Sequence, residues 1–191
     1  MRKFIPWIIL GVLVLFGFSS YNGLVTKEES VGKAWGNVES DYQRRTDLIP
    51  NLVNTVKGYA NFEKETLTAV IQARASATQV KIDANNLTPE NLAAFQQAQG
   101  GLSSALGRLL VVAESYPDLK ANQNFLDLQV QLEGTENRIN VSRQRFNDAV
   151  NDYNVGRRRF PAVIFASIFG FKEKGYFKAE AGAEKAPEVK F

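Results

Sequence analysis

The sequence contains no histidine and no cysteine, and its single methionine is the first residue. Zinc sites need thiolate or imidazole ligands, and helical di-iron and haem proteins also depend on His, Met or Cys ligands. Catalysis by Ser-His-Asp or Cys-His groups is excluded for the same reason. The chemistry that remains uses carboxylates, Lys, Tyr, Ser or Arg, or a hard cation bound by oxygen atoms. No cofactor is expected.

The chain also lacks a strong excess of charge of either sign. Its 23 Lys and Arg residues face 20 Asp and Glu residues, which leaves a net charge of +3. A nucleic-acid-binding domain normally carries a strongly basic face, so we expect no nucleic-acid partner. With 191 residues, of which 45% are hydrophobic, the chain is long enough for one globular domain and an attachment segment.

The amino end carries a long segment without charge, from Phe4 to Thr26. As a helix this segment would be about 34 Å long, at ~1.5 Å per residue, which is sufficient to cross the hydrocarbon core of a bilayer. We therefore expect residues 1–26 to form a transmembrane anchor. A cleaved signal peptide is the alternative, because Arg2 and Lys3 precede the apolar stretch. The length of the stretch and a poor cleavage site at 17–19 favour the anchor.

The orientation of this anchor is set by the Lys and Arg residues on its two sides. The counts are nearly equal, but Arg2 and Lys3 lie directly beside the apolar segment, whereas Lys27 is followed at once by Glu28 and Glu29. This arrangement favours a cytoplasmic amino end and a domain on the exported side of the bacterial inner membrane.

Between residues 24 and 153 the apolar residues recur at steps of three and four, which is typical of amphipathic helices. The first helix is expected to run to about Arg45. Asp47 is expected to cap a second helix with Pro50 in its first turn, and residues 88–90, Thr-Pro-Glu, predict the start of a third. The sequence thus predicts an all-α fold: an N-terminal transmembrane helix followed, over residues 27–159, by an antiparallel bundle of about four long helices.

The fourth helix has the most regular pattern. Large residues repeat every seven positions, at Phe125, Leu132, Ile139, Phe146 and Tyr153. Ordinary core packing is the simplest explanation of such a stripe. Because an even number of helices returns the chain to its starting end, we expect the residues after this helix to lie near the membrane.

The returning end combines three arginines with the apolar run 160–171, which is too short to cross a bilayer as a helix. We expect this region to contact the membrane interface and anionic lipid headgroups. Its membrane-interface residues are Arg157, Arg158, Arg159, Phe160, Ile164, Phe165, Ile168, Phe169 and Phe171. The alternative is that residues 160–171 fold back and cap the bundle. Residues 172–191 are predicted to be a disordered tail, from their Ala, Glu, Lys, Gly and Pro content.

Several polar motifs make the chain resemble a known family over nearly its whole length. They are Tyr21-Asn22-x-Leu24-Val25, Arg45-x-Asp47-Leu48-Ile49-Pro50-Asn51-Leu52-Val53, Glu114-x-Tyr116-Pro117-x-Leu119-Lys120-Ala121-Asn122, Leu132-Glu133-Gly134-Thr135-Glu136-Asn137-Arg138-Ile139, Arg143-x-x-Phe146-Asn147 and Tyr153-Asn154. With these motifs the chain resembles the LemA family of bacterial membrane proteins. The resemblance implies an amino-terminal membrane helix and an α-helical bundle, and it implies an amino end outside the cell. It implies no activity.

Charged residues lie close to the apolar stripes of the predicted bundle. They are Arg45, Glu63, Glu114, Glu133, Glu136, Arg138 and Arg143. A buried carboxylate needs a partner, so we expect these acids to meet arginines across helices in a structural ion-pair network. Two other readings are a pair of catalytic carboxylates, as in glycoside hydrolysis, and a site for a cation such as calcium. Continuous helices with short connections, and the lack of an acid-rich loop, disfavour both.

These features predict a non-enzymatic, membrane-anchored bundle that acts as a scaffold or self-assembling subunit. Its expected partners are the lipid bilayer, further copies of itself and another membrane protein. An adaptor or regulator of another membrane protein, such as a protease, is the first alternative. A carboxylate-dependent hydrolase is the second.

Overall fold

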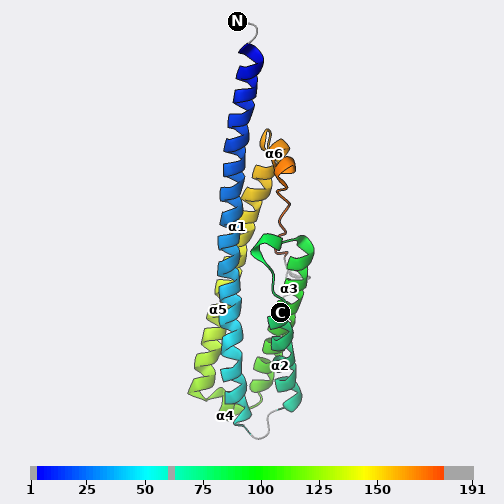
Figure 1. The fold of residues 1–191 in the computed structure, drawn as a ribbon. Helices are drawn as coiled ribbons and strands as arrows, with labels where there is room; N and C mark the ends of the chain where they lie inside the picture. The colour runs from blue at the N-terminus through cyan, green and yellow to red at the C-terminus, as the bar shows by residue number, and fades with distance from the viewer. Residues whose placement is uncertain (1–3, 60–62, 179–191) are drawn as a thin grey trace, which may run out of the picture.

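A computed structural model describes residues 4–59 and 63–178, without the side chains of residues 6, 8–10 and 13. Within these residues all regular secondary structure is helical (Figure 1). The elements are α1 (Ile5–Lys57), α2 (Lys64–Gln79), the 3-10 turn η2 (Ala84–Asn86), α3 (Pro89–Ala113), α4 (Pro117–Lys120), α5 (Gln123–Arg158) and α6 (Ala162–Phe169). Four of them are long helices, which agrees with the expected all-α bundle.

The molecule is an elongated bundle built on the antiparallel pair α1 and α5 (Figure 1). Helices α2 and α3 form a shorter hairpin against this pair, and α1 extends well beyond the hairpin at its amino end. The short helix α6 follows α5 and lies beside this extension, which places the carboxyl end of α5 next to the amino-terminal part of α1.

The core consists of two groups of buried side chains. The group nearer to α4 is mainly aliphatic, and the group nearer to α6 is rich in aromatic rings. In the second group the Trp35 ring meets Phe95 and Phe146 edge to face, with centroids 5.2 and 5.6 Å apart, which is a favoured aromatic geometry. All five heptad residues predicted for the fourth helix are buried, which confirms that stripe as core: Phe125, Leu132, Ile139, Phe146 and Tyr153.

The first helix does not end near Arg45 as predicted, because α1 continues through Pro50 to Lys57. Proline lacks the N–H that would bond to the carbonyl four residues earlier, which here belongs to Thr46. The Arg74 side chain, from α2, supplies the missing donor, since its Nε lies 3.1 Å from that carbonyl oxygen. A tertiary hydrogen bond thus replaces a helical one, which sequence periodicity alone could not indicate.

The carboxyl-terminal tail is the second correction. Residues 172–178 are not disordered as predicted, because they run in extended form along the bundle, with Lys174 and Phe177 each only 5% exposed. Phe177 belongs to the aromatic core group. Composition predicted disorder because the segment has few apolar residues, but its backbone is bonded by side chains from two helices. Residues 179–191 of the predicted tail lie outside the described residues.

Among the described residues, no helix is both long enough and apolar enough to cross a membrane. Arg2 and Lys3, on which the expected orientation rests, lie outside the described part of the chain.

The bond between Arg74 and the Thr46 carbonyl leads to a testable coupling. We expect Arg74→Ala to lower the free energy of unfolding by about 1–3 kcal/mol, because it leaves a buried carbonyl without a donor. In a Pro50→Ala background, Arg74→Ala should lower the free energy of unfolding by clearly less, because the alanine amide at position 50 can bond to the Thr46 carbonyl. Urea denaturation of the four proteins measures this coupling.

The exposed Arg44→Ala serves as the matched control in both backgrounds. Equal costs of Arg74→Ala with and without Pro50 would contradict the proposed replacement.

Candidate membrane-binding surface

Two segments far apart in the sequence form one apolar end of the molecule, which we call the apolar tip: residues 4–21, at the start of α1, and residues 160–171. The Phe165 ring lies directly over Gly17, where an added Cβ would be 3.1 Å from the ring. Tyr21 meets the rings of Phe169 and Phe171 edge to face, at 5.0 and 5.7 Å. These contacts hold α6 firmly against α1.

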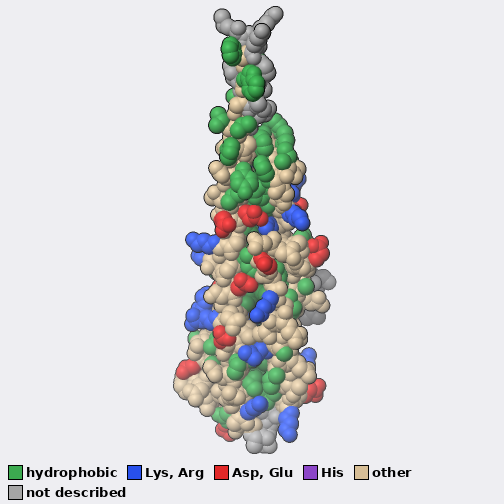
Figure 2. Space-filling view, viewed as in Figure 1, with side chains coloured by type: hydrophobic (Ala, Val, Ile, Leu, Met, Phe, Trp, Pro, Cys, Tyr) green, Lys and Arg blue, Asp and Glu red, His purple; other side chains and the backbone are tan. Residues whose placement is uncertain are grey.

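The outer side of the apolar tip remains exposed, and Figure 2 shows its hydrophobic side chains gathered at the narrow end. The exposed large residues at the amino end are Phe4, Ile5, Trp7, Val12, Val14, Leu15, Phe16, Phe18 and Tyr21, and those on the returning segment are Phe160, Val163, Ile164, Ile168 and Phe169. A hollow of about 500 Å³ between the two segments is lined by Val14, Gly17, Phe18, Tyr21, Phe165 and Phe169. A patch of this extent on a protein surface marks an interaction site.

The structure brings together the apolar residues predicted for the membrane interface. Phe160 and Ile168 are the most exposed of them, at 83% and 69%, and Ile164 and Phe169 are exposed as well. Phe165 and Phe171 are half-buried because they contact α1. One side of the segment thus contacts α1, while the opposite side faces outward.

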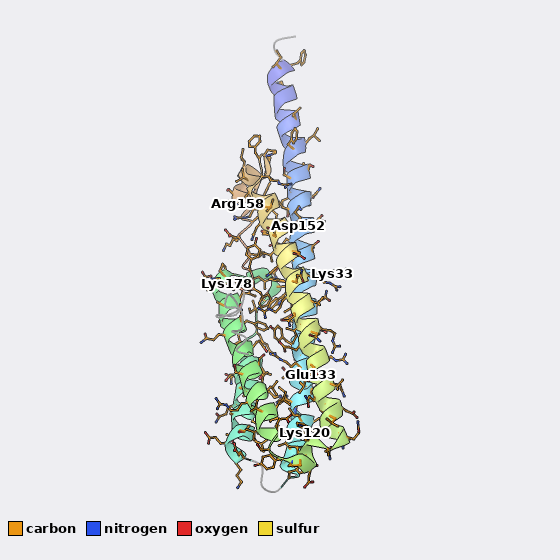
Figure 3. The ribbon with its side chains drawn as sticks, turned by 180° about the vertical axis from the view of Figure 1, so that it is seen from behind. Lys33, Lys120, Glu133, Asp152, Arg158 and Lys178 are labelled. Atoms are coloured by element: carbon orange, nitrogen blue, oxygen red, sulfur yellow. The ribbon has the colours of Figure 1, made fainter. Side chains whose placement is uncertain are left out.

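The three arginines before this segment differ in their surroundings. Arg158 and Arg159 are exposed, and Arg158 lies close to α6 (Figure 3). Arg157 instead makes an ion pair of 3.2 Å with Glu173, and its guanidinium lies 3.5 Å from the Phe171 carbonyl oxygen. Arg157 therefore binds the tail, whereas the side chains of Arg158 and Arg159 remain exposed.

Tyr153 lies buried at the base of the apolar tip and donates a hydrogen bond of 2.8 Å to the Lys172 carbonyl. Burial and, to a smaller extent, the negative charge of Glu28 raise the pKa of Tyr153 to about 12, while the positive charge of Arg157 partly opposes the shift. The phenol therefore stays protonated as a donor at every physiological pH.

A second polar arrangement surrounds Arg45, whose side chain is only 2% exposed. Its guanidinium donates to Glu136 at 2.9 Å, to the Ser103 hydroxyl at 2.8 Å and to the Gln99 side-chain oxygen at 2.7 Å. The amide nitrogen of Gln99 in turn donates to the Ala77 carbonyl at 3.3 Å. Arg45 thus links α1 to α3 and α5, and Gln99 extends the link to α2.

The other residues of the predicted ion-pair network do not join this cluster. Arg138 comes within 3.9 Å of Asp41 on α1, and Arg143 donates to the Lys178 carbonyl at 3.1 Å. The three remaining acids make local contacts: Glu63 is exposed and accepts from Thr66, Glu133 accepts from Gln129, and Glu114 pairs with Lys120. Among the predicted members, Arg45 on α1 and Glu136 on α5 form an ion pair across two helices.

Sequence reasoning missed Gln99 and Ser103 as partners of Arg45. A signal for Gln99 was present, because it stands seven residues from both Leu92 and Leu106 and so interrupts a buried stripe. A polar residue at such a position needs a partner inside the bundle. Among residues 4–59 and 63–178, no three Asp or Glu side chains come together as metal ligands would.

The fold and the apolar surface at one end define a class of all-helical bundle proteins, but they do not identify a single activity. The chain belongs to the LemA family, whose profile matches residues 34–191.

Comparison with known proteins adds more distant relatives. The magnetosome protein MamQ 2 of Paramagnetospirillum magneticum is 27% identical over 185 residues, which are 86% of this chain and 66% of the relative. The magnetosome protein MamQ of Magnetospirillum gryphiswaldense is 28% identical over 82% of this chain and 64% of the relative. Protein LemA of Metamycoplasma hominis is 25% identical, with 76% and 63% covered. The matches thus span just under two thirds of the length of these relatives.

The Arg45 cluster predicts an asymmetric response to mutation. Glu136→Gln should lower the free energy of unfolding by about 1–3 kcal/mol, because the buried guanidinium loses its counter-charge. In an Arg45→Met background the same change should cost close to nothing, because no buried charge remains. A double-mutant cycle by chemical denaturation measures the difference.

Glu133→Gln is the matched control, since Glu133 lies on the same helix and is exposed. It should leave stability unchanged in both backgrounds. A Glu136→Gln cost equal to that of Glu133→Gln would contradict the role given to the pair.

Proposed function

We propose that this chain is a membrane-anchored, non-enzymatic bundle that acts as a scaffold or self-assembling subunit at the bacterial cell membrane. The apolar tip is the observation that carries the proposal. It joins two segments about 140 residues apart into one exposed hydrophobic surface, and the hydrophobic effect opposes leaving such a surface in water.

The amino-terminal part of α1 supplies the anchor in this proposal. Residues 4–26 carry no charge, and they include residues 6, 8–10 and 13, whose side chains lie outside the described part. Helix α6 is too short to span a bilayer, so it lies at the membrane interface with its apolar outer side in the lipid. Arg158 ends α5 and Arg159 follows it, at the depth where anionic headgroups would lie. The bundle then stands on the exported side.

A non-enzymatic role is supported by the use of the charged residues. The chain lacks His and Cys. Arg45 and Glu136 bond to each other across two helices, and Arg45 also bonds to Gln99, so both charged groups serve to hold the helices together. The relatives are named magnetosome protein MamQ and protein LemA, and neither name states a reaction.

Self-assembly is supported by the long, regular helices and by the proposed anchor. Confinement of copies to one membrane raises their effective concentration, so weak contacts between bundles suffice for assembly. An adaptor for another membrane protein would use the same anchor but would need a different chain as its partner.

The membrane contact can be tested by labelling, because the natural chain offers no competing thiol. We expect an environment-sensitive fluorophore on Leu15→Cys or Ile168→Cys to shift to the blue in liposomes and to be quenched by a lipid-attached quencher. The same label on Val111→Cys, which is 72% exposed on α3, should show neither effect. Equal signals from positions 168 and 111 would rule out the interfacial placement of α6.

Assembly is tested by extraction in mild detergent followed by size-exclusion chromatography with light scattering. We expect a mass of several copies of this chain with no second protein. A co-purifying membrane protein in fixed ratio would instead identify an adaptor, and a monomer without partner would leave the scaffold proposal without support.

A further inference from the structure

The tail segment 172–178 is bound as a peptide ligand is bound in a recognition cleft. Three side-chain amides each make two hydrogen bonds to the backbone of one tail residue. Asn154 binds Lys174 at 2.9 and 3.1 Å, Asn147 binds Phe177 at 3.0 and 2.9 Å, and Gln96 binds Lys178 at 2.7 and 3.2 Å. Each amide offers one donor and one acceptor, as a neighbouring β-strand would.

The spacing of the two asparagines fits an extended chain. Asn147 and Asn154 stand seven residues apart on α5, which is about 10 Å along a helix axis. Their ligands Lys174 and Phe177 are three residues apart, which is also about 10 Å along an extended backbone. Helix and tail therefore keep register, and the tail runs antiparallel to α5.

The side chains of the bound segment add sequence selectivity to this backbone recognition. Phe177 lies among aromatic rings, stacked on Trp35 at 6.2 Å and edge to face with Phe146 at 5.4 Å. Lys174 is buried and pairs with Glu28 at 2.7 Å. The cleft thus recognises a lysine followed three residues later by phenylalanine.

Gly175 restricts the recognised sequence further. Its N–H donates to the Leu87 carbonyl at 2.8 Å. A Cβ on this residue would stand 2.8 Å from the Cα of Pro89, so a larger residue does not fit without movement of the backbone. The cleft is therefore selective for Lys-Gly-x-Phe in extended form.

We propose that this cleft also binds the Lys174–Phe177 segment of a second copy of the chain, so that copies are linked by exchanged tails. The second copy carries the recognised sequence, and every bond described above can form with it unchanged. Gly170, with a φ of 75°, ends α6 directly before the segment, in a left-handed conformation that other residues rarely adopt. The wide range of backbone angles open to glycine allows the tail to leave α6 in another direction. Exchange of an identical element is a low-cost route to assembly.

This inference rests on the proposed self-assembly and names the contact that would produce it. Two chains are prepared from the natural sequence, which contains no cysteine. One carries Arg143→Cys and the other Lys178→Cys, and their tags differ in size. They are co-expressed, extracted in mild detergent and treated with a thiol crosslinker about as long as an arginine side chain. Arg143 contacts the Lys178 carbonyl, and Figure 3 shows Lys178 toward the amino end of α3.

We expect a covalent pair that contains both tags. Lys178→Cys co-expressed with Val111→Cys measures random collision. A chain with both Arg143→Cys and Lys178→Cys shows that the two thiols are within reach of the linker.

A pair yield no higher than with Val111→Cys, while the doubly substituted chain closes on itself, would overturn tail exchange. Light scattering on the same sample separates the two proposals, because an oligomer without linked tails contradicts only the exchange, and a monomer contradicts self-assembly as well. Failure of the doubly substituted chain to link would contradict the cleft contact itself.

Discussion

The antiparallel pairing of α1 and α5 is the contact on which the rest of the structure depends. Their stripes of large residues pack along most of the bundle, and the aromatic group around Trp35 joins them to α3 and to the tail. Because α5 runs back toward the amino end of α1, α6 is carried to that end, and the tail starts there before it runs back along the bundle. The apolar tip and the tail cleft are both consequences of this return.

Polar groups inside the bundle share one solution to the cost of burial. The Thr46 carbonyl is bonded by Arg74, the Arg45 guanidinium by Gln99, Ser103 and Glu136, and the tail backbone by side-chain amides. In each case a side chain from another helix supplies the hydrogen-bond partner that the buried group needs. These bonds fix which helices lie beside one another, since each requires a particular partner at a particular height.

The parts of the fold that sequence reasoning predicted are those set by local periodicity. The heptads of α5 and the start of α3 at Thr88 are local patterns, and the structure contains both. Reasoning failed where a distant side chain changes a local rule. Pro50 looked like a helix start because its missing bond is free there, and only Arg74, 24 residues away, lets it stand inside α1.

For the candidate site, the amino acids by themselves determined the absence of thiol and imidazole chemistry, the charge-free segment 4–26 and the apolar run 160–171. These follow from composition and order, which folding does not change. Only the tertiary structure decided that the two apolar segments share one surface, that Arg45 bonds to Glu136, and that residues 172–178 fill a cleft. Those contacts join residues distant in the chain, and their free energy depends on the geometry that brings the partners together.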